Sequence, residues 1–312
     1  MKAVRFHEYG GPEVLKVEDV PKPTPGPGEV LVKIYAASVN PIDWKLRSGM
    51  LKERMPVNLP MTIGRDFAGV VEAVGPGVAE FKPGDEVYGT TPWGRDGTFA
   101  EYAVTVPAKL APKPKSIDFV HAAGVPVAAA AAWHAVHGED AGNIQRGQTV
   151  LVQGAAGGVG TYFVQFAKAL GAKVIGKASG KNAEHLKSLG VDHVIDYTKE
   201  KFEDVVKGVD VIIDNVLGEV QKRSWKSLKP GGVLVSLSGP PSADLAKEHG
   251  ARGVMASGAH GEARLGEISK LIDSGKIRPQ VSEVLPLSEA RRAHELSQTG
   301  HARGKIIIKI AD

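Results

Sequence analysis

The sequence predicts an α/β protein with two domains, one rich in short strands and one built on a doubly wound sheet of six parallel strands. Three observations lead to this fold class. Short β-rich runs separated by glycine and proline fill roughly the first hundred residues. From residue 118 onward, strand-like and helical segments alternate, which is typical of a parallel sheet covered on both faces. A chain of 312 residues with 42% hydrophobic side chains can also bury two cores.

The β-rich domain is predicted over residues 1–118 and 279–312. Its strands are expected in EVLVKIYAASVN (29–40), FAGVVEAVG (67–75), DEVYG (85–89) and TFAEYAVT (98–105). The closing segment GKIIIKI (304–310) suits a strand that returns to this domain. The second domain, residues 119–278, is therefore expected as an insertion between two parts of the first.

The second domain is predicted to open with an alanine-rich helix over residues 119–139. Helical segments lie between most of its strands and are expected at 160–170, 182–189, 220–228 and 262–274. The six strands are expected at 149–154, 173–178, 193–197, 209–215, 232–237 and 252–257.

A glycine-rich turn joins the first of these strands to an amphipathic helix. Glycines without Cβ atoms allow a tight turn whose backbone N–H groups and helix N-terminus can approach a pyrophosphate. Glycines also mark ordinary turns, but a strand before the triplet and a helix and second strand after it indicate a dinucleotide site. The predicted cofactor-binding residues of this turn are Gly154, Ala155, Ala156, Gly157, Gly158, Val159 and Gly160.

The end of the second strand indicates NADPH as the cofactor. Sites that select NAD usually carry Asp or Glu there, whereas this chain has Ser179, Lys181 and Asn182. These groups can donate charge-assisted hydrogen bonds to a 2′-phosphate. Tyr197, after the third strand, is a further candidate for the same phosphate. The alternatives are that Lys181 and Asn182 only open a surface helix, and that Tyr197 is a half-buried aromatic at the sheet edge.

The ends of the fourth and fifth strands are also predicted to line the cofactor groove. In an open parallel sheet, ligands bind beyond the carboxyl ends of the strands where the strand order reverses. The residues expected there are Asn215, Val216, Ser236, Leu237, Ser238 and Gly239.

Several motifs in one order carry a family resemblance: ASVNPIDWKLRSG, PMTIGRDFAGVVEAVGPGV, FKPGDEVYG, GTFAEYAV and HARGKIII. Over nearly its whole length the chain resembles the medium-chain dehydrogenase/reductase superfamily, in the zinc-free quinone oxidoreductase branch that includes zeta-crystallin-like and enone reductases. The resemblance implies a GroES-like catalytic domain, a Rossmann domain and a substrate cleft between them.

The chain departs from zinc-dependent members of that superfamily. They carry Cys where this chain has Asn40, and a His-Glu pair where it has Arg65 and Asp66. The chain has no cysteine, and His134 and His137 merely share a helix face. A catalytic zinc needs three protein ligands, so no metal is expected. Without a Lewis acid, ordinary alcohol oxidation is disfavoured.

The resemblance also implies catalytic residues in the β-rich domain. Asn40 of the V-N-x-x-D motif is expected to meet the nicotinamide end of the cofactor. Lys45 stands where many relatives have Tyr, and is predicted either to stabilise a substrate oxyanion or to be a solvated surface lysine. Asp43 is expected to orient Lys45 or to cap a short helix, and Trp93 to form a pocket wall. Arg303 and Lys305 are candidates for contacts with the cofactor phosphates.

These assignments predict a reductase that transfers hydride from NADPH to a quinone or to an alkene conjugated to a carbonyl. One alternative is a stand-alone enoyl reductase for thioester or polyketide-like chains. Another is an NADPH-binding regulatory or RNA-associated protein with vestigial activity. The 39 basic residues are scattered and barely exceed the 35 acidic ones, so no nucleic-acid partner is expected. No membrane span is expected either. A cytoplasmic homodimer is expected, joined through the edge strands of two nucleotide domains, with the apolar segments 232–237 and 252–257 as the pairing strands.

Overall fold

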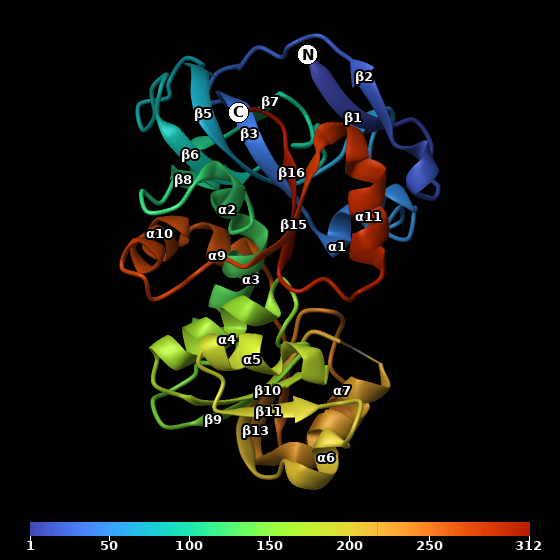
Figure 1. Cartoon of the computed structure of the whole chain (residues 1–312), viewed down its shortest axis with the longest axis vertical. Helices are drawn as coiled ribbons and strands as arrows, with labels where there is room; N and C mark the ends of the chain where they lie inside the picture. The colour runs from blue at the N-terminus through green and yellow to red at the C-terminus, as the bar shows by residue number, and fades with distance from the viewer. Residues whose placement is uncertain (217) are drawn as a thin grey trace. The chain divides into compact units, whose positions relative to one another are not determined.

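The computed structural model describes residues 1–216 and 218–312, and the chain divides into two compact units (Figure 1). The first unit comprises Met1–Val127, Leu265–Gly275 and Pro279–Asp312, and the second comprises Ala128–Arg264 and Lys276–Arg278. Helix α10 (Leu265–Asp273) thus groups with the β-rich unit, whereas the domain boundaries predicted from sequence place it in the second domain, residues 119–278.

Two sheets form the first unit. The larger has the order β15-β16-β3-β5-β6-β8, with β7 also paired to β3, and the smaller has the order β2-β1-β4. The C-terminal strand β16 pairs antiparallel with β3, so both ends of the chain contribute to this unit. The strands are β1 (Lys2–Phe6), β2 (Lys16–Asp19), β3 (Val30–Val39), β4 (Met61–Thr62), β5 (Asp66–Val74), β6 (Glu86–Thr90), β7 (Tyr102–Thr105), β8 (Leu110–Pro112), β15 (Val281–Pro286) and β16 (Lys305–Lys309).

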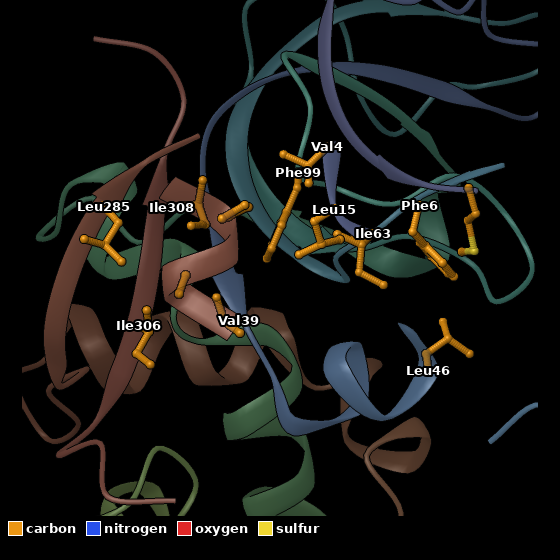
Figure 2. Close-up of a cluster of buried hydrophobic side chains, with 14 residues drawn as sticks. Val4, Phe6, Leu15, Val39, Leu46, Ile63, Phe99, Leu285, Ile306 and Ile308 are labelled. Carbon is orange, nitrogen blue, oxygen red and sulfur yellow. The ribbon is translucent and has the colours of Figure 1, made fainter. Parts of the chain in front are cut away.

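A cluster of 14 buried apolar side chains holds this unit together (Figure 2). It joins Val4 and Phe6 of β1 to Leu46 of helix α1 (Pro41–Arg47) and to Ile306 and Ile308 of β16. Helix α11 (Ala290–Gln298) packs against α1, β3 and β16. Burial of these apolar surfaces fixes α1 and the start of β16 beside the end of β3.

The single helix predicted over residues 119–139 is wrong, because the structure has two helices there, α2 (Phe119–Ala123) and α3 (Pro126–His137). Asp118 caps α2 by accepting a hydrogen bond from the backbone N–H of His121 at 2.8 Å. Pro126 cannot continue that helix, since it has no N–H and its ring excludes the carbonyl of the preceding turn. It does suit the first position of α3.

The six-stranded parallel sheet predicted for the second domain is confirmed, with the order β11-β10-β9-β12-β13-β14. The strand order reverses between β9 and β12, where a doubly wound sheet opens for ligands. The strands are β9 (Thr149–Gln153), β10 (Lys173–Ala178), β11 (His193–Asp196), β12 (Val209–Asp214), β13 (Leu228–Ser236) and β14 (Arg252–Met255). The remaining helices are α4 (Gly160–Ala169), α5 (Ala183–Ser188), α6 (Phe202–Val205), α7 (Glu219–Ser224), α8 (Ala243–Glu248) and α9 (Ala259–Glu262).

Apolar side chains cover both faces of this sheet. Phe202 and Trp225 are buried with Leu151 and Ile212 on one face. Helix α4 contacts β9 and β10 and buries Phe163 and Phe166. Within residues 1–216 and 218–312, the structure contains no helix whose length and hydropathy would let it cross a bilayer.

His294 of α11 is a buried titratable group in the first unit. Its ring lies edge-on to Phe99, with 5.8 Å between the ring centroids, and neither ring nitrogen has a hydrogen-bond partner among the described residues. Burial lowers its pKa to about 3, and the nearby Arg47 acts in the same direction. The folded protein therefore holds this imidazole neutral.

We predict that His294→Leu makes the free energy of unfolding less dependent on pH in the acid range. Below a pH of about 6.5 the unfolded chain binds a proton at this histidine that the folded chain does not. The free energy of unfolding of the wild type should therefore fall by about 1.4 kcal/mol per pH unit from 6.5 toward 3, relative to the variant. Urea denaturation between about pH 4 and pH 7 measures this difference. Parallel profiles for the two proteins would contradict it.

Candidate active site

The strand register brings five polar side chains together at the end of β3, and we call them the polar cluster. Asp66 of β5 pairs with Ser38, and Ile306 of β16 pairs with Val39, which sets Lys305 beside Asn40. Helix α1 begins directly after Asn40 and adds Asp43. The members of the polar cluster are Ser38, Asn40, Asp43, Asp66 and Lys305, and all five are buried.

The Asp66 carboxylate is the centre of the polar cluster. It accepts hydrogen bonds from Ser38 Oγ at 2.7 Å, from Asn40 Nδ2 at 2.9 Å and from the backbone N–H of Val127 at 2.8 Å. The Lys305 ammonium lies 3.6 Å away. Burying a carboxylate is costly unless it is hydrogen-bonded and paired with a cation, and Asp66 has both kinds of partner.

Lys305 fixes the orientation of the Asn40 amide. Its Nζ donates to Asn40 Oδ1 at 2.7 Å and to the Val39 carbonyl at 3.3 Å. An ammonium has no acceptor atom, so the amide oxygen must face it. Both N–H bonds of the amide are used within the chain, since Nδ2 donates to Asp66 and, at 3.4 Å, to the Ser38 carbonyl. The Asn40 side chain can therefore only accept a hydrogen bond from a ligand, through the remaining lone pair of Oδ1. Burial lowers the pKa of Lys305, and the two carboxyl groups oppose that shift.

Asp43 lies in the first turn of α1 and has an unusual acidity. Its Oδ2 accepts the backbone N–H of Asn40 at 2.7 Å, which makes it part of the helix cap. Burial above all, and also the negative charge of Asp66, raise its pKa to about 7, against the hydrogen bond from Asn40 and the charges of Lys305 and Arg65. The hydrogen bond of Asp43 thus goes to the helix start and not to Lys45.

An apolar cavity of about 370 Å³ lies next to Asp43 in the first unit. The buried guanidinium of Arg65 is stacked on Trp93, with 3.5 Å between its carbon and the ring centroid. The cavity is lined by Asp43, Arg65 and Trp93, by Arg54 and Arg95, and by mostly apolar residues: Ile42, Leu46, Met55, Pro56, Val57, Met61, Ile63, Gly64, Thr91, Pro92 and Gly94. The cavity-lining residues between positions 54 and 63 were not predicted from the sequence, because they form no recognisable catalytic or binding motif.

Three further residues of the first unit lie apart from this cavity. Lys45 is half-buried, its ammonium is 5.6 Å from the Trp44 ring centroid, and it is absent from the cavity lining, so its oxyanion role stays a prediction. Arg303 is exposed. The role of Arg303 and Lys305 at the cofactor phosphates also stays a prediction, although the close contacts of Lys305 all lie inside the polar cluster.

The glycine turn of the second unit has the geometry that a dinucleotide needs. Gly154 has a φ of +68°, which side-chain-bearing residues rarely adopt. A Cβ on Gly160 would lie 2.1 Å from the Gly154 carbonyl oxygen, so only glycine fits at the start of α4. Ala155 and Ala156 are buried, while Gly158 and Val159 are partly exposed. The turn thus fits a pyrophosphate at a helix N-terminus.

The ends of β12 and β13 lie beside this turn. A Cβ built on Gly154 would be 3.4 Å from Val216 and 3.9 Å from Asn215. The backbone N–H of Leu237 donates to the Asp214 carbonyl at 3.1 Å, which joins the two strand ends. Ser236 is buried and accepts the backbone N–H of Ser238 at 3.3 Å, and Gly239 is also buried. The structure therefore brings the predicted groove residues of these strands to one edge.

The end of β10 carries the polar residues predicted to bind a 2′-phosphate. Ser179 Oγ accepts from Asn182 Nδ2 at 3.1 Å, and Lys181 and Tyr197 are exposed. Asp196, which sequence reasoning missed, lies so close that a Cβ on Gly180 would be 2.2 Å from its Oδ2. Because Asp196 directly precedes Tyr197, a predicted cofactor residue, its place in the sequence could have indicated that it lies near the same site. Asp196 accepts hydrogen bonds from the backbone N–H and hydroxyl of Thr198, which lower its pKa.

The residues at the zinc-ligand positions do not fit a catalytic zinc. Arg65 has no lone pair to offer a metal, and Asn40 Oδ1 and Asp66 are held by Lys305. In the part of the chain that the structure describes, no group of three or more His, Cys, Asp or Glu side chains could hold a metal ion. His134 contacts Asp140 at 3.0 Å and accepts the Ser257 N–H at 3.0 Å, so both of its nitrogens have protein partners.

Comparison with known proteins agrees with this fold. Residues 26–115 match the family described as alcohol dehydrogenase GroES-like domain, and residues 189–308 match the family described as zinc-binding dehydrogenase. The NAD(P)H oxidoreductase RTN4IP1, mitochondrial, of Mus musculus is 35% identical over 99% of this chain and 89% of its own. The NADPH-dependent alkenal/one oxidoreductase, chloroplastic, of Arabidopsis thaliana is 38% identical over 99% of this chain and 79% of its own. A solved quinone oxidoreductase from Coxiella burnetii is 36% identical, covers 99% of each chain and has a TM-score of 0.92.

The chain belongs to the medium-chain dehydrogenase/reductase superfamily, in which a GroES-like domain accompanies a Rossmann domain. Within that superfamily it falls among the quinone and alkenal/one oxidoreductases, and it is an oxidoreductase.

We predict that Lys305→Met strongly destabilises the protein, because it leaves the buried Asp66 carboxylate without its cation. Removing one partner of a buried ion pair costs about 3–5 kcal/mol in free energy of unfolding. The double variant Lys305→Met/Asp66→Asn should recover part of that loss. Lys309→Met, on the same strand with an exposed side chain, is the matched control and should change stability by less than about 0.5 kcal/mol. Additive losses in urea denaturation would show that the two groups are not coupled.

Proposed function

We propose that the protein is an NADPH-dependent reductase that transfers hydride, without zinc, to a quinone or to an alkene conjugated to a carbonyl. The observation that carries this proposal is the polar cluster: Asn40 and Asp66, at two positions where zinc-dependent members of the superfamily carry metal ligands, are held by the Lys305 ammonium beside an apolar cavity. A quinone or conjugated alkene can accept hydride without a Lewis acid, whereas oxidation of an alcohol usually needs one to lower the pKa of the hydroxyl group.

The residues that would hold NADPH come from the second unit. The Gly154–Gly160 turn offers backbone N–H groups to the pyrophosphate, and Ser179, Lys181 and Asn182 offer donors to the 2′-phosphate. When bound, NADPH supplies the hydride and the protein supplies position and electrostatics. Lys305 presents Asn40 as an acceptor, which suits the carboxamide N–H groups of a nicotinamide.

The cavity of the first unit is proposed to receive the acceptor. About 370 Å³ is at the lower end of the volumes typical of small-molecule sites, so it suits one ring or a short chain. Apolar walls exclude water from the acceptor, and Arg65 and Trp93 present a flat, positively charged surface to an oxygen-bearing ring.

Turnover with defined acceptors tests this function. NADPH oxidation should require a simple quinone or enone, be more efficient with NADPH than with NADH, and persist after exhaustive dialysis against EDTA. A preference for an enoyl thioester would favour the enoyl reductase alternative. Stoichiometric zinc whose removal abolishes turnover, or the absence of turnover with all of these acceptors, would contradict the proposal.

We predict that Lys181→Ala weakens the use of NADPH selectively. Loss of one charge-assisted hydrogen bond to the 2′-phosphate costs about 1–3 kcal/mol in binding free energy, and NADH has no such phosphate. The matched control is Lys187→Ala, which removes an exposed lysine of α5 that pairs with Glu184. The ratio of kcat/KM for the two cofactors measures the effect. An equal loss with NADH and NADPH would place Lys181 outside the phosphate site.

A homodimer joined through the nucleotide-binding sheets is also proposed. In that sheet β14 is the edge strand next to β13, and its residues Arg252, Gly253 and Met255 are exposed. An unpaired edge exposes backbone donors and acceptors, and pairing with a second copy satisfies them. The segment Gly232–Leu237, expected from sequence to share in this pairing, lies mostly in β13 and is already paired on both sides.

A further inference from the structure

Asp43 is a buried carboxyl group that faces a cavity, an arrangement that the helix cap alone does not require. Capping residues usually lie at the surface, as Asp118 does at the start of α2 with a largely exposed side chain. Asp43 is only 2% exposed and lines the cavity proposed for the acceptor. One of its oxygens, Oδ2, is held at 2.7 Å by the backbone N–H of Asn40. The position of the carboxyl group is therefore fixed relative to the cavity.

The charges around Asp43 make it able to give up and regain a proton. The negative charge of Asp66, on β5, disfavours ionisation of Asp43, and the positive charge of Lys305, on β16, favours it. Arg65, on the cavity wall, also favours the ionised form. These influences act on a group whose own burial disfavours ionisation, so neither state is strongly excluded.

The other side of α1 contributes little to this balance. Helix α11 packs there and carries His294, which burial keeps neutral, and Glu295, whose charge acts on Arg47. Two more cavity residues, Arg54 and Arg95, are exposed, and Arg95 is paired with Glu29. Asp43 therefore titrates mainly under the influence of the polar cluster and Arg65.

We propose that Asp43 is the proton donor that completes the reduction. This inference rests on the proposed function. When hydride leaves C4 of NADPH, which becomes NADP⁺, it forms a C–H bond at the β-carbon of an enone and an electron pair moves to the carbonyl oxygen. The O–H bond of Asp43 then breaks, its proton forms the second new bond at the α-carbon, and the enolate becomes a ketone. Asp43 is left as a carboxylate and regains a proton from water. One hydride and one proton are consumed in each turnover.

The acidity of Asp43 suits this task. A general acid works best when its pKa lies near the operating pH, and burial raises the pKa of Asp43 to about 7. Below that pH the group is protonated and can donate. Above it, the wild-type rate of enone reduction should fall about tenfold per pH unit if proton transfer limits turnover.

Asp43→Asn is the test variant, because its amide oxygen can still accept the Asn40 N–H while the group can no longer donate an acidic proton. Infrared spectra of the protein without NADPH provide the first readout. The wild type should show a carboxylic acid C=O band that disappears with a midpoint near pH 7, and this band should be missing from Asp43→Asn. Asp118→Asn, which alters an exposed cap, should retain the band. A wild type with no such band, or a band that survives in Asp43→Asn, would overturn the inference.

Turnover gives the second readout. Asp43→Asn should reduce enones roughly 100-fold more slowly, the lower end of the effect of a general acid, and its rate should not fall above pH 7. A quinone whose quinol is itself strongly acidic needs no proton and should be affected less. If the variant retains the wild-type enone rate and pH profile, Asp43 is not the donor while the proposed function stands. If the wild type itself reduces neither acceptor, the proposed function fails.

Discussion

The burial of the Asp66 carboxylate is the constraint on which the site depends. A carboxylate removed from water must be hydrogen-bonded and paired, and Ser38, Asn40, Val127 and Lys305 meet this need at distances of 2.7–3.6 Å. These partners come from three parts of the first unit, so satisfying one side chain joins the end of β3, the start of β16 and the first turn of α3. The apolar cluster of Figure 2 provides the packing energy, and Asp66 fixes which polar groups meet.

In the proposed reaction, this arrangement takes the place that a metal ion has in the zinc-dependent dehydrogenases of the same superfamily. A metal ion would supply a fixed positive charge and hold its ligands in place. In this chain the Lys305 ammonium supplies the charge and orients Asn40, while Arg65 carries a second positive charge on the cavity wall. An ammonium is a weaker electrophile than zinc, so the arrangement suits acceptors that are already electron-poor. The same low-dielectric environment raises the pKa of Asp43, which connects the ion pair to the proposed proton transfer.

Local patterns in the sequence predicted most of the fold. The six strands of the second unit and the Gly154–Gly160 turn depend on periodicity and glycine spacing within short windows. Pro126 could have been used to predict the break between α2 and α3, since a proline seldom continues a helix. The contact between Asn40 and Lys305 could not be predicted in this way, because it joins residues 265 positions apart through the register of β3 and β16. The resemblance indicated Asn40 and Asp43, but their partners and the apolar wall follow only from tertiary packing.

We infer that the chain moves hydride from NADPH onto carbon of an electron-poor acceptor and adds the proton separately. The most direct test is reduction of an enone with NADPH that carries deuterium at the transferable C4 position, followed by mass spectrometry and NMR of the product. We expect one deuterium at the β-carbon and a hydrogen from solvent at the α-carbon, and in D₂O with unlabelled NADPH we expect hydrogen at the β-carbon and deuterium at the α-carbon. Oxidation of the labelled cofactor without deuterium in the product would contradict it.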